Sequence, residues 1–249
     1  MFERRKIDFP WEGRIEPFRL VGNVYFVGTY QASSHLIDTG DGLILIDTGY
    51  ENTLYLLIDS IYKLGFCPEQ IKYIVNTHWH GDHTAGSAAL ANLSGAKNLI
   101  GREDFEKAKK YFLADGIISD GDTLTLGNCK MEFLETPGHT KGTISLFFDV
   151  VEGGKTLRVG MFGGAGRNTL KDGCFDFDGA REAYFSSLNR LSNEKVDVFI
   201  GNHTWNNDTC SKARILAQTG ENTFVDPTLW NEFLTYCEKE LQKLIDANE

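Results

Sequence analysis

The chain has 249 residues, of which 41% are hydrophobic and 24% charged, and its formal net charge is -10 at pH 7. This balance is typical of a globular protein with a sizeable core, and we expect one domain over residues 1–249. An acidic chain repels phosphate backbones, which argues against nucleic acid as a partner. No apolar stretch is long enough to cross a bilayer, so we expect no membrane partner. The sequence specifies no oligomeric state.

The N-terminal segment and the cysteines bear on the cellular compartment. Residues 1–13 include Arg4, Arg5 and Lys6 but no apolar stretch behind them, so this segment does not resemble a secretory signal. The 5 cysteines are scattered and odd in number, which is typical of free thiols in a reducing compartment. We therefore expect a cytoplasmic protein, or a periplasmic or secreted one if the N-terminus is truncated.

Strands predominate in the first third of the chain. Short apolar runs at 18–20 and 24–27 are separated by a turn, and LIDTG occurs at 36–40 and again at 45–49, which predicts a second hairpin. Residues 52–64 place leucines and isoleucines on one helical face and are followed by glycine, as is usual at a helix end.

After the first third of the chain, strands and helices do not alternate regularly. We expect the last helix to begin with Asp226 as its N-cap and Pro227 in its first turn. Strands come in runs with helices between them, which favours mixed sheets covered by helices over a strictly alternating parallel fold. The expected helices are 84–93, 103–112 and 182–191, and the expected strands are 71–75, 98–100, 122–126, 129–134, 144–150, 157–162 and 196–200.

The segment THWHGDHTAG concentrates residues that bind metals. His78, His80 and His83 lie within it, and Asp82 lies between the last two. Imidazole and carboxylate groups are ligands that zinc accepts. Because the segment follows an apolar strand, we expect a loop that projects these side chains into one small volume. Solvated loop histidines are the alternative, but four ligand-type residues in a run this short argue against it.

Two further histidines also follow apolar strands. His139 lies in ETPGHTKG after the strand at 129–134, and His203 lies in IGNHTW after the strand at 196–200. We expect His35, which lies in a strand away from these motifs, to be structural. The pattern therefore predicts one metal centre made from His78, His80, Asp82, His83, His139 and His203.

The order of these motifs resembles the metallo-β-lactamase superfamily. LIDTG, HxHxDH, TPGHT and a late strand-terminal histidine occur in the order seen in that family and span nearly the whole chain. The resemblance implies an α/β fold, a four-layer αββα sandwich of two mixed β-sheets flanked by helices. It also implies two Zn²⁺ ions as cofactors, with Asp47 supporting the ligands from behind.

One ligand position of the superfamily is altered in this chain. Many members place a metal-bridging aspartate, and one subclass a cysteine, after the strand that here is 157–162, but Gly163 and Gly164 stand there and Asp172 is too distant. The remaining pattern resembles the third subclass of class B β-lactamases, as does the run NTFVDPTLWNEFL. That likeness implies a first zinc held by His78, His80 and His139 and a second held by Asp82, His83 and His203.

The residues expected to hold the substrate differ from that subclass. Its members usually carry serines that bind the substrate carboxylate, whereas Gly164 and Gly166 have no hydroxyl. Arg167 or Asn168 could take this role, and Trp205 could line the pocket. Since a charge-assisted hydrogen bond strengthens binding, we expect serine at 164 and 166 to lower KM.

The resemblance implies a dinuclear zinc hydrolase acting on a small-molecule substrate. A metal-bound hydroxide would attack a carbonyl carbon, and Asp82 would orient it. His80 stands where the oxygen-reducing di-iron members carry glutamate, which favours zinc over iron. A β-lactam or similar amide is the favoured substrate. The alternatives are lactones, thioesters or other small esters, a nuclease, against which the acidity argues, or a non-catalytic metal-binding protein.

Overall fold

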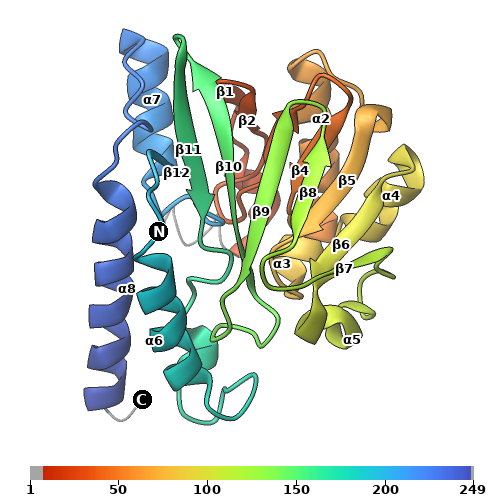
Figure 1. Ribbon diagram of the computed structural model, residues 1–249. Coiled ribbons are helices and arrows are strands. Elements are labelled where there is room, and N and C mark those ends of the chain that lie inside the picture. Colours follow the sequence, from red (N-terminus) through yellow and green to blue (C-terminus); the bar gives the residue numbers. More distant parts are fainter. Residues whose placement is uncertain (1–7, 248–249) are drawn as a thin grey trace.

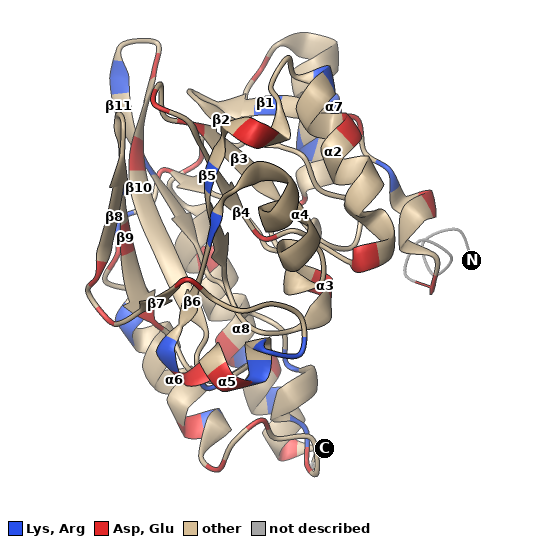
Figure 2. Ribbon diagram, turned by 90° about the vertical axis from the view of Figure 1, so that its right-hand side faces the viewer, with Lys and Arg blue, Asp and Glu red and all other residues tan. Residues whose placement is uncertain are grey.

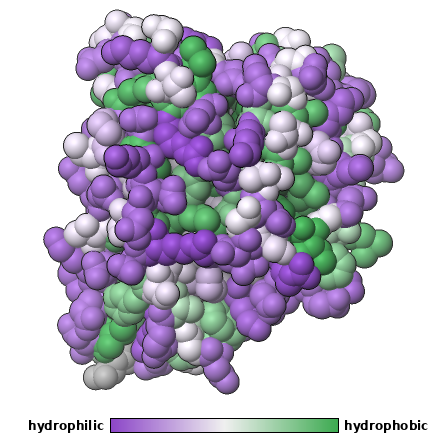
Figure 3. Space-filling view, in the orientation of Figure 1, coloured by the Kyte–Doolittle hydropathy of each residue, from purple (hydrophilic) through white to green (hydrophobic). Residues whose placement is uncertain are grey.

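The computed structural model describes residues 8–247, in which two β-sheets pack face to face and helices cover their outer sides (Figure 1). Arg4, Arg5 and Lys6 of the N-terminal segment lie outside the described residues. Hydrophilic residues predominate on the face shown in Figure 3. Among the helices of residues 8–247, none has the length and apolarity needed to cross a membrane.

The first sheet has seven strands that follow one another in chain order. The first four are paired antiparallel, and the last four are paired parallel through crossover connections that include α2 (Leu54–Lys63) and α4 (Ser87–Ser94). The strands are β1 (Phe18–Val21), β2 (Val24–Phe26), β3 (His35–Asp38), β4 (Leu43–Ile46), β5 (Ile71–Asn76), β6 (Lys97–Gly101) and β7 (Gly116–Ile118).

The second sheet has five strands in the order β12-β11-β10-β9-β8. Its members are β8 (Thr123–Leu126), β9 (Cys129–Glu135), β10 (Ile144–Glu152), β11 (Lys155–Met161) and β12 (Val198–Phe199). All pairs are antiparallel except β11 with β12. Helices α6 (Ala180–Leu191) and α8 (Leu229–Asp246) cover its outer face, and α7 (Thr209–Thr219) lies near β12 (Figure 1). Both sheets are therefore mixed, as predicted.

Strand β4 is buried on both faces, which explains why its sequence is apolar without interruption. In β4, Ile44 and Ile46 belong to the core between the two sheets, whereas Leu43 and Leu45 pack with Leu57 of α2. The side chains alternate between the two layers because successive residues of a strand point to opposite faces. The predicted αββα sandwich is confirmed.

Several helices differ from the sequence-based expectation. The helix expected over 84–93 is divided into α3 (Gly81–Thr84) and α4, so Asp82 and His83 lie on a helical turn and not in an open loop. The Thr84 hydroxyl donates to the carbonyls of Trp79 and His80, which ties this turn to the preceding segment. The helix expected over 103–112 is shortened to α5 (Phe105–Ala108).

The C-terminal third holds further differences. Helix α7 was not predicted, and β12 is shorter than the expected strand at 196–200. Asp226 does not cap α8, because the helix begins at Leu229 and the Asp226 carboxylate accepts hydrogen bonds from the backbone and hydroxyl of Thr228. Short 3₁₀ helices complete the described elements at Pro10–Gly13, Glu51–Thr53, Pro68–Gln70, Arg102–Asp104 and Asn168–Leu170.

Candidate metal centre

The predicted metal ligands lie at one edge of the sandwich, where strands from both sheets end. Thr77 follows β5, and its carbonyl accepts a hydrogen bond of 3.0 Å from the backbone nitrogen of Ile144, which joins the two sheets there. Neighbouring parallel strands end at the same edge of a sheet, so residues that follow these strands lie close together although they are far apart in the sequence. The residues that follow strands at this edge include Asp47, His78, His139, Gly163 and His203.

The six predicted ligands form two sets of three, and within each set the ligand atoms lie within 4.8 Å of one another. In the first, Nε2 of His139 is 3.2 Å from Nε2 of His78 and 2.9 Å from Nδ1 of His80. In the second, Oδ2 of Asp82 is 3.3 Å from Nε2 of His83 and 3.9 Å from Nε2 of His203. Tetrahedral zinc with bonds of about 2.0–2.1 Å separates its ligand atoms by roughly 3.3 Å, which these distances approach.

Backbone carbonyls accept hydrogen bonds from the outward ring nitrogens of His139 and His203. Nδ1 of His139 lies 2.9 Å from the carbonyl of Gly166, and Nδ1 of His203 lies 2.5 Å from that of Gln31. A carbonyl only accepts, so both rings donate from Nδ1 and turn the lone pair of Nε2 inward. Nε2 of His83 is buried, and although Oδ2 of Asp82 lies 3.3 Å away, it forms no hydrogen bond of regular geometry with any of residues 8–247. A metal ion would satisfy these inward atoms.

The charge state of the site also fits a divalent metal. Burial lowers the pKa of His139 to about 3 and that of His203 to about 4, so both imidazoles are neutral, the form that binds metal. Burial opposes ionisation of Asp82, but His83 and His203 offset it and lower the pKa of this carboxyl below its usual range. Burial lowers the pKa of His83, whereas Asp82 and Asp47 raise it to about 10, so this ring is protonated until a metal ion at Nε2 takes the place of the proton. The carboxylates of Asp82 and Asp47, which stabilise that proton, would equally stabilise a metal cation in its place.

Asp47 connects the two sets from behind, at the position the resemblance implied. Its buried carboxylate accepts hydrogen bonds from the backbone nitrogen of Thr77 at 2.8 Å and from the Thr77 hydroxyl at 2.9 Å. It also lies 2.8 Å from Nδ1 of His83, while the Thr77 hydroxyl lies 3.0 Å from Nδ1 of His78. One carboxylate therefore orients a ring in each set.

A second buried carboxylate, Asp104, was not predicted from the sequence. It accepts hydrogen bonds from the Trp79 nitrogen at 3.0 Å, the Thr140 hydroxyl at 2.7 Å and the Gly142 nitrogen at 2.8 Å. Burial raises its pKa to about 6. Trp79 is next to two ligands and Thr140 follows His139, so Asp104 fastens together the segments that carry the first set. The sequence alone indicates this role only by placing an acidic residue shortly after a buried strand.

Comparison with known proteins identifies the family. Residues 27–203 match the metallo-beta-lactamase superfamily. The chain belongs to this superfamily. A solved subclass B3 metallo-beta-lactamase of Bradyrhizobium japonicum, BJP-1, is similar over 97% of this chain and 99% of its own, with 30% identity and a TM-score of 0.87. FEZ-1 from Legionella gormanii is similar over 95% of this chain and 97% of its own, with 28% identity and a TM-score of 0.89.

A curated relative with another activity is also similar. The hydroxyacylglutathione hydrolase of Erythrobacter litoralis (strain HTCC2594) is 30% identical over 122 residues, which are 49% of this chain and 43% of that protein. The chain thus spans less than half the length of this relative. The likeness to BJP-1 confirms the predicted family and the predicted likeness to the third subclass of class B enzymes, which is subclass B3.

The glycines that replace a superfamily ligand are required by close packing. A Cβ atom at Gly163 would overlap the carbonyl oxygen of Ile144. One at Gly164 would lie 2.7 Å from the side chain of Thr143 and 3.0 Å from Cβ of His139, and one at Gly166 would lie 3.0 Å from the His139 ring. The Ile144 backbone at Gly163 and the Thr143 side chain at Gly164 therefore leave no room for a bridging aspartate.

This packing argues against the expectation that serines at these positions improve substrate binding. We predict that Gly164→Ser and Gly166→Ser displace the His139 ring, since overpacking a close site costs about 1–3 kcal/mol. The variants should hold less metal at the first set, and KM should not fall. Metal content per chain and steady-state kinetics with a hydrolysed substrate would test this. A lower KM with full metal content would contradict it.

The residues expected to line the substrate pocket lie in different places. A pocket of about 280 Å³ contains His80, Asp82 and Asn168 in its wall. Arg167 does not line this pocket, because its side chain lies 5.4 Å over the Tyr236 ring and 3.8 Å from Glu240 of α8. Trp205 stacks on His203 with ring centroids 4.5 Å apart and lines a neighbouring cavity.

Proposed function

We propose that the protein is a dinuclear zinc hydrolase that cleaves the amide bond of β-lactams or of closely similar small molecules. The carrying observation is the pair of complete ligand sets, which face one pocket. Likeness to a subclass B3 enzyme over 97% of the chain supports it. Nitrogen ligands with one carboxylate favour zinc over calcium or magnesium, which prefer oxygen.

The shape and charge of the protein favour a small molecule as substrate. The net charge is -10, and acidic and basic side chains are mixed along α5 and α6 (Figure 2). This charge distribution supports neither a nucleic acid nor an anionic membrane surface as partner. A pocket of about 280 Å³ admits the reacting part of a compact substrate.

The residues around the pocket have distinct roles in this reaction. Bound zinc would lower the pKa of water to about 7 and polarise the substrate carbonyl. Asp82 stays ionised, and its Oδ1 atom can accept a hydrogen bond from the attacking water and orient it. Asn168 offers amide donors to the substrate. Trp79 and Tyr111 form apolar walls that limit the access of further water.

Metal analysis and a substrate panel test this function. Protein stripped with a chelator and reloaded should hold two zinc ions per chain, because each set offers three ligands. It should then hydrolyse a penicillin or cephalosporin, and the activity should disappear with the chelator and return with zinc. Protein with two zinc ions that hydrolyses no β-lactam would contradict the proposal, as would protein that binds iron only.

A thioester hydrolase is the second candidate. The similarity to hydroxyacylglutathione hydrolase over 49% of the chain favours it. The absence of hydroxyl groups at Gly164 and Gly166, where the third subclass usually has them, also weakens the hold on a β-lactam carboxylate. The ratio of kcat/KM for a glutathione thioester to that for a cephalosporin separates the two candidates.

A further inference from the structure

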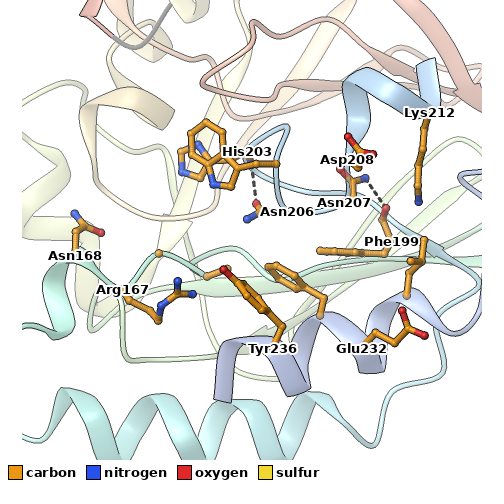
Figure 4. Close-up of a pocket in the computed structure, with 15 residues that line it drawn as sticks. Arg167, Asn168, Phe199, His203, Asn206, Asn207, Asp208, Lys212, Glu232 and Tyr236 are labelled. Carbon is orange, nitrogen blue, oxygen red and sulfur yellow. Dashed lines mark hydrogen bonds between the residues drawn. The ribbon is translucent and has the colours of Figure 1, made fainter. Parts of the chain in front are cut away.

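A cavity of about 810 Å³ adjoins the pocket that contains the metal ligands. The two share Gly166, Asn168 and His203 in their walls, so a molecule can extend from one into the other. Figure 4 shows the cavity between the segment that carries Arg167, the His203 segment and helix α8. The proposed reaction does not use it.

Aromatic side chains line the middle of this cavity. Phe199 and Phe233 have ring centroids 4.7 Å apart, and the Tyr236 ring stacks on that of Phe233 at 6.4 Å. Tyr236 is 50% exposed and Trp205 is 52% exposed, although both are large and partly apolar. Aromatic surface that stays open in a concave site is typical of ligand binding.

The ends of the cavity carry two cations of different character. Arg167 already lies over Tyr236 and near Glu240. Lys212 of α7 lies at the opposite end (Figure 4), where its Nζ atom is buried and has no hydrogen-bond partner among residues 8–247. It lies 5.7 Å over the Phe224 ring, which accepts no conventional hydrogen bond. A buried ammonium group without an acceptor is costly, so the flexible Lys212 side chain gains by turning toward an anion in the cavity.

Two carboxylates restrict which anion can bind. Asp208 and Glu232 lie at the same end of the cavity as Lys212 (Figure 4). Both are exposed at the cavity wall. Their charges repel a dianion such as a phosphate monoester more strongly than a monoanion. The combination favours a single carboxylate.

We propose that this cavity binds the distal arm of the substrate, and that this arm is aromatic or aliphatic and ends in a carboxylate recognised by Lys212. The inference rests on the proposed function, because the reacting carbonyl must lie in the adjoining metal pocket. The substrate class is thus an elongated amide, thioester or lactone with an acid-terminated side arm.

Calorimetric titration of the zinc-loaded protein tests this without turnover. The probes are 4-phenylbutyrate and its uncharged analogue 4-phenylbutyramide. The acid should bind at least tenfold more tightly than the amide, and Lys212→Met should abolish this preference. Arg214→Met is the matched control, since it removes the same charge from an exposed position of the same helix and should keep the preference.

The outcomes separate the subsite from the reaction. Equal affinities for acid and amide in the natural sequence would overturn the proposal. An acid preference that survives Lys212→Met would also overturn it, because the carboxylate would then bind the metals. If the preference depends on Lys212 but the protein hydrolyses no member of the substrate panel, the subsite stands and the proposed function fails.

Discussion

Replacement of His139 by alanine is expected to empty the first ligand set and to reduce hydrolysis by about a thousandfold or more. Nε2 of His139 lies within 3.2 Å of the ligand nitrogens of both His78 and His80, so the set keeps only two ligands without it. Loss of a metal that stabilises the developing charge removes several kcal/mol from the transition state, and about 1.4 kcal/mol corresponds to tenfold in rate. Elemental analysis and kcat/KM would measure the two effects.

Two further variants complete this experiment. His203→Ala should empty the second set instead, because that set is formed by Asp82, His83 and His203. His35→Ala is the matched control, since His35 is buried in β3 against Phe26 and lies outside both sets. Thermal melting would confirm that each variant is folded. Two zinc ions in His139→Ala, or a lost zinc in His35→Ala, would show that the ligand assignment is wrong.

The residues predicted as ligands lie close together because they follow strand ends at one edge of the sandwich. His78, His139 and His203 each follow an apolar strand, and such runs can be recognised without the structure. The family resemblance added the mixed sheets and the role of Asp47. Its buried contacts with Thr77 and His83 then agree with that role.

Other features depend on distances that no sequence pattern contains. The sequence shows that Gly163 and Gly164 lack side chains, but only the structure shows that Ile144 and Thr143 fill the space. The orientation of Arg167 depends on Tyr236, which is far away in the sequence.

The sequence pattern also did not predict some helices or the roles of isolated polar residues. Helix α7 is amphipathic only weakly, with Thr209 as its single buried residue, so its sequence lacked the apolar stripe by which helices were recognised. Asp104 and Lys212 matter because tertiary packing buries them. Nothing in their immediate neighbours in the sequence distinguishes them from surface charges.

Replacement of Asp47 by alanine is expected to lower the free energy of unfolding by about 3–5 kcal/mol and to weaken zinc binding by about 10–100-fold. The change leaves three buried donors without an acceptor, namely the nitrogen and hydroxyl of Thr77 and Nδ1 of His83. Asp47 also has a φ angle of 56°, which aspartate tolerates better than alanine. Denaturant unfolding and competitive zinc titration would measure both losses.

The isosteric variant Asp47→Asn separates orientation of the ligands from stability. Asparagine fits the positive φ angle and its carbonyl can still accept from the Thr77 nitrogen, so unfolding should change by only about 1–2 kcal/mol. Its amide group, however, would face Nδ1 of His83 and donate to it. His83 would then carry its proton on Nε2, the atom that points toward Asp82 and the second metal. We therefore expect the asparagine variant to be nearly as stable as the natural protein but to bind the second zinc at least tenfold more weakly. Zinc affinity that falls only in proportion to stability in both variants would show that Asp47 supports the fold alone and does not set the proton position on His83.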